Sequence, residues 1–455
     1  MPAFTTQNPA TGEDLETYDT VSSAELDRRL QTAHDAWTRH RATPLADRAA
    51  ALRRLAASLE ADADDHAALM TREMGKTLAQ ARAEAEKCAW LCRYYADHGA
   101  DFLADDDVQT EAARSFVAYE PLGPVLGIMP WNFPHWQAFR FIVPAVMAGN
   151  VALLKHAENV LGCGEAIARG FREAGFEDGV VQHLIVEVGQ VEGVISDRRV
   201  AGVSLTGSER AGRAVGAQAG RALKPCVLEL GGSDAFVVLE DADLGAAVEA
   251  GVASRTQNNG QSCIAAKRFI LHREIAEAFT ERFTRAMEAL AVGDPTDGAT
   301  DLGPLAREDL RDALHDQVER MQREGATLLT GGGIPQREGW FYPPTVLTDV
   351  TETMLPFREE LFGPVAALVV AEDEADALRL ANATPFGLGG AVFTGERERG
   401  ERFARGLRSG AAFVNEMTKS HPALPFGGVG QSGVGRELAR QGIRSFVNEK
   451  TVWMD

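Results

Sequence analysis

From residue 125 to residue 230 the sequence alternates regularly between strand-like and helix-like segments. Short loops join them, as in a parallel sheet wrapped by helices. The strands expected are 125–129, 151–154, 182–186, 202–205 and 226–230, with helices over 134–147, 160–174, 191–195 and 209–219. The predicted class is α/β, and a second α/β series is expected over 236–414.

Three helices are expected before this alternation, over residues 22–40, 44–73 and 77–103. Ser22 and Glu25 form a capping-box pattern at the start of the first. Strand-like segments lie at 115–120 and 444–453. Because 455 residues are too many for one ordinary core, two or three domains are expected.

Acidic residues outnumber basic ones by 66 to 46, which gives a formal net charge of −20. Nucleic acids and anionic membranes are therefore poor partners. Lysine is scarce beside arginine, and this acidic composition fits a halophilic protein, since concentrated salt shortens the range of self-repulsion. The chain shows no leader-like N-terminus and no apolar run of membrane-spanning length, so a cytoplasmic location is expected.

A single cysteine stands in a polar turn near the middle of the chain. Cys263 follows a helix-like segment, 242–255, and precedes a strand-like one, 268–271. A thiol in such a turn, surrounded by backbone N–H groups, suits nucleophilic catalysis. The alternative is a buried structural cysteine, which the polar neighbours disfavour. The five cysteines of the chain show no disulfide pattern, and no metal site is predicted.

Further polar residues stand where predicted strands end or helices begin. Glu229 follows a nearly apolar strand, where burial of an unpaired carboxylate is costly, so it is either a general base or a strand cap. Asn132 precedes the helix at 134–147 and either caps that helix or donates to an oxyanion. Arg140 on the same helix can clamp a substrate carboxylate or form a surface ion pair.

Ligands of open α/β sheets bind at strand ends, and two such ends carry suitable residues. Gly207 and Ser208 open a helix whose N-terminus offers N–H groups to a phosphate, although the spacing also suits an ordinary tight turn. Lys155 and Glu158 follow another strand. A carboxylate there can accept the hydroxyls of a ribose and repel a 2′-phosphate, or be surface charge only.

Six motifs in order resemble those of the aldehyde dehydrogenase superfamily. They are PWNFP at Pro130, LTGSERAG at Leu205, ELGG at Glu229, GQSC at Gly260, EELFGPV at Glu359 and PFGGVGQSG at Pro425. The resemblance runs essentially end to end. Trp136 and Arg140, the KHA segment at Lys155, the CIAAKRF segment at Cys263 and the compact length are similar to the short prokaryotic succinate-semialdehyde dehydrogenases.

The resemblance implies a role for each matching residue. Cys263 would attack the aldehyde carbon as a thiolate, while Asn132 and the Cys263 backbone N–H hold the oxyanion of the thiohemiacetal. Hydride would pass to the nicotinamide, and Glu229 would activate the water that hydrolyses the resulting thioester. The residues implied in cofactor binding are Pro130, Trp131, Lys155, Glu158, Gly207, Ser208, Leu230, Glu360 and Phe362. Those implied in substrate binding are Trp136, Arg140, Ser262 and Ser420.

The resemblance also implies an aldehyde dehydrogenase-like fold with three parts. These are a Rossmann-type NAD-binding domain over 1–105 and 123–229, an α/β catalytic domain over 230–428, and a small β oligomerisation element over 106–122 and 429–455. A homodimer or homotetramer is expected.

The expected reaction is oxidation of succinate semialdehyde to succinate, with other short aliphatic or ω-carboxy aldehydes left open. NAD is expected over NADP, which stays possible, because family members that prefer NADP tend to carry a small residue in place of Glu158. A cofactor-independent cysteine hydrolase would leave Lys155, Glu158, Gly207 and Glu360 without a role. A catalytically retired structural or binding protein would tend to lose Cys263 or Glu229.

Overall fold

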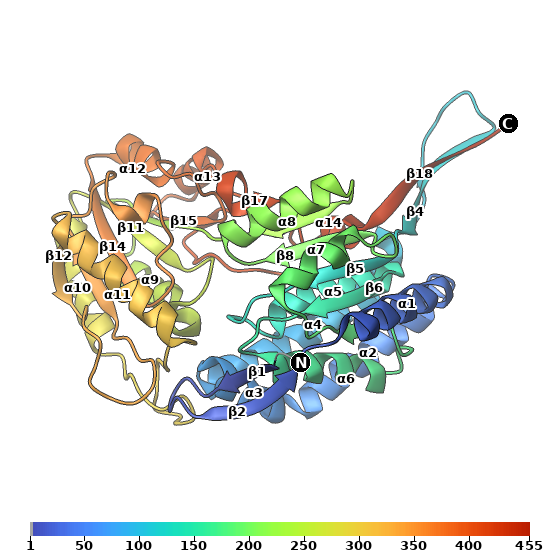
Figure 1. The fold of residues 1–455 in the computed structure, drawn as a ribbon. Coiled ribbons are helices and arrows are strands. Elements are labelled where there is room, and N and C mark those ends of the chain that lie inside the picture. The colour runs from blue at the N-terminus through green and yellow to red at the C-terminus, as the bar shows by residue number, and fades with distance from the viewer. Residues whose placement is uncertain (1–2) are drawn as a thin grey trace.

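The computed structural model describes residues 3–455 and contains two large sheets, each covered by helices, and an arm that projects from the body (Figure 1). The first sheet has six strands in the order β17-β9-β8-β5-β6-β7. Its strands are β5 (Pro124–Ile128), β6 (Val151–Lys155), β7 (Val181–His183), β8 (Gly202–Thr206), β9 (Cys226–Glu229) and β17 (Gly433–Val434). All pair in parallel except β17, which is antiparallel to β9.

Helices connect the parallel strands of the first sheet, as the sequence predicts. They are α5 (Trp136–Ala148), α6 (Leu161–Glu173), α7 (Val188–Ser196) and α8 (Glu209–Arg221). Ser208 caps α8 by accepting a hydrogen bond from Ala211 N at 3.3 Å. The strands β5, β6 and β8 are buried nearly throughout, which explains why they read as continuous apolar runs.

The N-terminal region differs from the prediction at two points. A hairpin of β1 (Ala3–Gln7) and β2 (Asp14–Asp19) was not predicted. One helix was predicted over 44–73, but the chain forms two. The four helices of this region are α1 (Ser23–His40), α2 (Leu45–Ala61), α3 (Ala63–Met74) and α4 (Leu78–Phe102). The break lies at Asp62, whose φ of −104° and ψ of 22° end α2 without a proline or glycine. The predicted cap of α1 is confirmed, since Ser22 accepts from Glu25 N at 3.2 Å.

The second sheet has seven strands in the order β12-β13-β14-β11-β10-β15-β16. They are β10 (Asp234–Val238), β11 (Ala266–His272), β12 (Thr327–Thr330), β13 (Thr345–Thr348), β14 (Val365–Ala371), β15 (Gly390–Phe393) and β16 (Phe413–Val414). The helices around it are α9 (Leu244–Thr256), α10 (Ala276–Glu288), α11 (Glu308–Arg323), α12 (Glu374–Ala381) and α13 (Arg397–Gly406). Short 3-10 turns lie at Gln257–Gly260, Leu355–Phe357 and Gly430–Ser432.

The arm consists of β3 (Asp106–Asp107), β4 (Arg114–Pro121) and β18 (Val447–Met454), and the C-terminus lies at its tip (Figure 1). β18 pairs with β4 along its whole length. Before it, α14 (Ala439–Arg444) packs against α4 and α5, so the end of the chain returns to the first sheet. No helix within residues 3–455 is long and apolar enough to cross a membrane.

Candidate active site

Parallel pairing brings the ends of four strands to one edge of the first sheet. Ile128 stands opposite both Lys155 and Leu205, and Thr206 stands opposite Glu229. The predicted residues Lys155 and Glu229, with the Gly207–Ser208 turn that follows Thr206, therefore share this edge. Ligands of parallel sheets bind at such an edge.

The turn before Cys263 is fixed by its backbone and by a buried arginine. Asn258, Asn259 and Gly260 have left-handed φ values of 57°, 56° and 77°. A Cβ atom at Gly260 would overlap the backbone of Gly363, so glycine is required there. The fully buried Arg255 guanidinium donates to Gly260 O at 2.6 Å and to Ala266 O at 2.7 Å.

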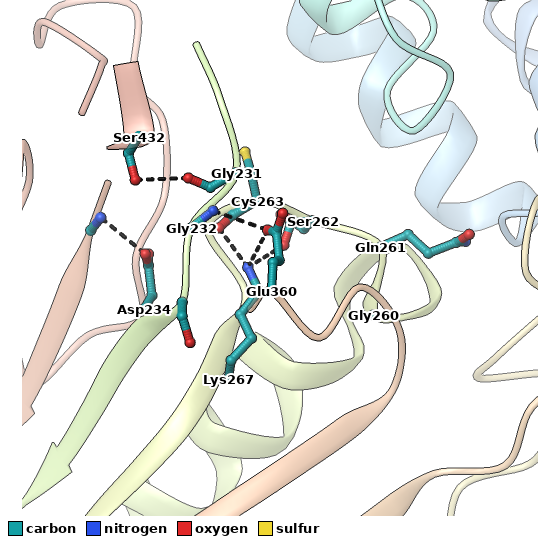
Figure 2. A network of polar contacts seen from close by, with 12 residues as sticks. Gly231, Gly232, Asp234, Gly260, Gln261, Ser262, Cys263, Lys267, Glu360 and Ser432 are labelled. Atoms are coloured by element: carbon teal, nitrogen blue, oxygen red, sulfur yellow. Dashed lines mark hydrogen bonds and ion pairs between the residues drawn. The ribbon is translucent and has the colours of Figure 1, made fainter. Parts of the chain in front are cut away.

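The side chain of Lys267 contacts the backbone of the Cys263 turn and the carboxylate of Glu360 (Figure 2). Lys267 Nζ donates to Ser262 O at 2.8 Å and to Cys263 O at 2.6 Å, and it lies 3.1 Å from Glu360 Oε1. Glu360 also accepts from Gly232 N at 3.1 Å. Glu360, which was predicted to bind a ribose, is therefore linked through Lys267 to the turn that carries Cys263. Lys267 was not singled out from the sequence, although two adjacent basic residues, Lys267 and Arg268, at the start of a buried strand are a usable signal.

The Cys263 thiol is not pre-ionised. Burial raises its pKa to about 12, although Lys267 and Arg140 act in the opposite direction. At neutral pH the thiol is therefore protonated, and it needs a base before it can attack a carbonyl carbon.

Glu229 has the properties expected of that base. Its side chain is buried, and neither carboxylate oxygen has a hydrogen-bond partner among the described residues. Burial, followed by the neighbouring Glu437, raises its pKa well above the usual range, so the carboxylate accepts a proton readily. Glu437 was not predicted. It forms an ion pair with Arg140, the residue predicted to clamp the substrate carboxylate.

Asn132 contacts the turn that carries the nucleophile. Its Nδ2 donates to Gln261 O at 3.0 Å, and its backbone carbonyl accepts from Asn258 Nδ2 at 2.6 Å. Because an amide group has two N–H donors, one remains for an oxyanion. The segment is held from behind by Glu84, which accepts from His135 N and Trp136 N, each at 2.8 Å. Glu84 pairs in turn with the buried Lys76.

A cavity of about 890 Å³ opens beside the thiol, and it brings together every residue predicted to bind substrate. Those predicted residues are Trp136, Arg140, Ser262 and Ser420, and Cys263 lines the same cavity. Lys87 on α4 was not predicted. Its Nζ donates to Ser420 Oγ at 2.8 Å and lies 4.3 Å from the centre of the Trp136 ring. Burial and the nearby Arg140 lower the pKa of Lys87 to about 8.

The remaining predicted residues fit a dinucleotide. A Cβ atom at Gly207 would meet only a Leu205 methyl group at 3.8 Å, so space remains before the N-terminus of α8 for a phosphate group. Gly212 lets α8 approach Leu230, where any larger side chain would clash. The Trp131 and Phe362 rings meet edge to face with centroids 5.6 Å apart. Pro130 is partly exposed beside Trp131, Lys155 is buried and Glu158 is exposed.

Residues 3–455 contain no group of three or more His, Cys, Asp or Glu placed to hold a metal ion. All five cysteines are free: Cys88, Cys92 and Cys163 are buried, whereas Cys226 and Cys263 are partly exposed.

Three relatives share nearly the whole chain. Succinate-semialdehyde dehydrogenase [NADP(+)] 1 of Mycobacterium tuberculosis is 51% identical over 100% of both chains. A probable succinate-semialdehyde dehydrogenase [NADP(+)] of Synechocystis is 49% identical over 99% of this chain and 100% of its own. The crystal structure of succinic semialdehyde dehydrogenase from Streptococcus pyogenes, in complex with NADP+, superposes with a TM-score of 0.97 at 36% identity, over 99% of this chain and 100% of that one. These names give no support to the predicted preference for NAD.

The match to a known family extends over the same length. Residues 2–452 match the profile of the aldehyde dehydrogenase family. The resemblance read from six motifs and the predicted α/β fold are both confirmed by this match and by the structural superposition. The chain belongs to the aldehyde dehydrogenase family.

Proposed function

We propose that this protein oxidises succinate semialdehyde to succinate with a nicotinamide dinucleotide as oxidant. The observation that carries the proposal is the cavity that joins the Cys263 thiol to basic side chains, because an ω-carboxy aldehyde needs both a nucleophile and a cation. The relatives named above support the same substrate.

Cys263, which lines the cavity, acts with Glu229 and Asn132 in the chemical steps. Glu229 takes the proton of Cys263, and the sulfur bonds to the aldehyde carbon. Asn132 and the Cys263 backbone N–H donate to the oxygen that becomes negative. A bound nicotinamide supplies the acceptor for the hydride that leaves this carbon, which turns the adduct into a thioester. After it has released the first proton to solvent, Glu229 removes a proton from water. The water oxygen bonds to the thioester carbon and displaces the Cys263 thiolate, and the acid so formed loses its proton to give the carboxylate.

Aldehyde selectivity tests the substrate. We expect kcat/KM for succinate semialdehyde to exceed that for butyraldehyde by about 10- to 100-fold, since a hydrogen-bonded charge stabilises the bound acid. Absorbance of the reduced nicotinamide measures the rate with each aldehyde, across a range of potassium chloride concentrations. Equal values would contradict the substrate but not the oxidation, whereas no nicotinamide reduction with any aldehyde, together with ester hydrolysis that needs no cofactor, would indicate the hydrolase alternative.

We infer that Glu158 favours NAD over NADP, against the preference in the relatives' names. The carboxylate is exposed, follows the β6 strand end, and acts electrostatically on the buried Lys155. It would repel a 2′-phosphate bound there, whereas Lys155 would attract it. For Glu158→Ser we expect the ratio of kcat/KM for NADP to that for NAD to rise by about 10-fold or more.

The matched control is Glu173→Ser, which removes the same charge from an exposed position at the far end of α6. Steady-state kinetics with both cofactors give the ratio for each variant. An equal change in both variants would indicate a general charge effect, and no change in either would remove Glu158 from the cofactor site.

We also propose that the arm pairs with a second copy of the chain, in a dimer or tetramer. β18 is an edge strand, and Trp453 and Met454 at its end are 46% and 42% exposed. Unpaired backbone groups on an edge strand favour pairing with another strand. Sedimentation velocity gives the mass directly, and a monomer at micromolar concentration would contradict the proposal. The halophilic character and the cytoplasmic location stay predictions.

A further inference from the structure

Three basic side chains line the cavity, and they differ in what neutralises them. Arg140 pairs with Glu437, and Lys419 lies 2.6 Å from Glu416 and is half-exposed. Lys87 forms no ion pair with any carboxylate of residues 3–455; it has the Ser420 hydroxyl and the face of Trp136 instead. Of these three cations, Lys87 is therefore the one that is free to pair with an anion.

We propose that Lys87, with Ser420, binds the carboxylate of the aldehyde substrate and selects ω-carboxy aldehydes over neutral ones. The inference rests on the proposed oxidation of such an aldehyde. Nothing in the six motifs pointed to Lys87, because it lies on α4, 333 residues before Ser420 in the sequence.

The donor geometry suits a carboxylate. An ammonium group has three N–H donors, and one of those on Lys87 is taken by Ser420 Oγ at 2.8 Å. Because the hydroxyl accepts that bond, its own hydrogen is free to donate. Two ammonium donors and one hydroxyl donor therefore remain on two residues that line the cavity, beside the ring of Trp136. A neutral aldehyde would leave them unmatched.

Kinetics of Lys87→Met with two aldehydes of equal carbon number test the proposal. For succinate semialdehyde we expect KM to rise by about 10- to 100-fold. For butyraldehyde the change should stay below about 3-fold, which also shows that the variant folds. Lys419→Met, an equal change of charge in the same cavity, is expected to raise either KM by less than about 2-fold, because Lys419 is exposed and already paired.

The outcomes separate this inference from the proposed function. A wild-type enzyme without preference for succinate semialdehyde would refute the proposed substrate, whatever Lys87 does. A wild-type preference that survives Lys87→Met would overturn the role of Lys87 and leave the substrate intact. Equal losses with both aldehydes would assign Lys87 a structural role in place of a selective one.

The pH dependence adds a readout that a structural role would not give. Since the pKa of Lys87 is lowered to about 8, its charge is present below that pH and lost above it. The KM for succinate semialdehyde divided by the KM for butyraldehyde should therefore rise above pH 8 in the wild type. The same ratio should stay flat in Lys87→Arg, whose guanidinium keeps its charge. The other titratable groups around Lys87 and its cavity are Glu84, Cys88, Arg140, Glu249, Cys263, Asp301, Glu416 and Lys419. Effects that they have on both aldehydes cancel in the ratio.

Discussion

Cys263→Ala is expected to abolish aldehyde oxidation, with kcat lowered by at least about 10⁴-fold. No other thiol can replace it, since Cys88, Cys92 and Cys163 are buried and Cys226 lies at the opposite end of β9 from Glu229. The surrounding turn is held by Arg255 and Lys267 through backbone atoms, so loss of the sulfur leaves the turn intact.

Steady-state rates with succinate semialdehyde give the size of this effect, and thermal unfolding checks that the variant folds. Cys226→Ala is the matched control and should keep near wild-type activity. Alkylation of the wild type by iodoacetamide adds a chemical test: because the pKa of Cys263 is about 12, labelling should speed up about tenfold per pH unit. Residual turnover above about one percent in Cys263→Ala would exclude Cys263 as the nucleophile.

Glu229→Gln is expected to stop turnover at the thioester, with the steady-state rate about 10²- to 10⁴-fold lower. The amide fills the same buried space but cannot accept a proton from water. If the first attack proceeds, one reduced nicotinamide should form per active site in a rapid burst, followed by a slow phase. Stopped-flow absorbance measures both phases.

Hydroxylamine separates the two steps that Glu229 can serve. It attacks a thioester without help from a base, so it should restore turnover if only hydrolysis is blocked. A variant with neither a burst nor rescue would show that Glu229 is needed earlier, to deprotonate Cys263. The raised pKa of Glu229 also means that wild-type turnover should increase with pH until this carboxyl is ionised.

Much of the first sheet could be predicted because its central strands, β5, β6 and β8, are buried on both faces and its loops are short. The strand predicted at 151–154 is observed at Val151–Lys155, and the helix predicted at 209–219 is observed at Glu209–Arg221. The break at Asp62 escaped prediction because neither a proline nor a glycine marks the point where α2 ends.

The site divides in the same way. Cys263 and Glu229 could be proposed because a lone cysteine in a polar turn and a carboxylate at the end of an apolar segment are both conspicuous in the sequence. Lys87 and Glu437 could not, because each is an ordinary charged residue until the fold brings it to a partner. Ser204, for example, donates to Glu437 at 3.4 Å across 233 residues of sequence.

The strand β17, which joins the first sheet from the C-terminal end of the chain, also determines when the active site can be completed during synthesis. β17 covers the edge strand that ends in Glu229, and Ser432 just before it donates to Gly231 O across 201 residues. Glu437 follows a few residues later. On the ribosome, a growing chain already contains Cys263 and most of both sheets while Glu229 still lacks its neighbour Glu437 and β9 still lacks its pairing with β17. Because β17 and Glu437 are synthesised near the end of the chain, the site is completed only in the final stretch of translation. Closing the loop of 201 residues between Gly231 and Ser432 then carries an entropic cost. A message cut short just before β17 would yield nearly all of the fold's mass but no working enzyme.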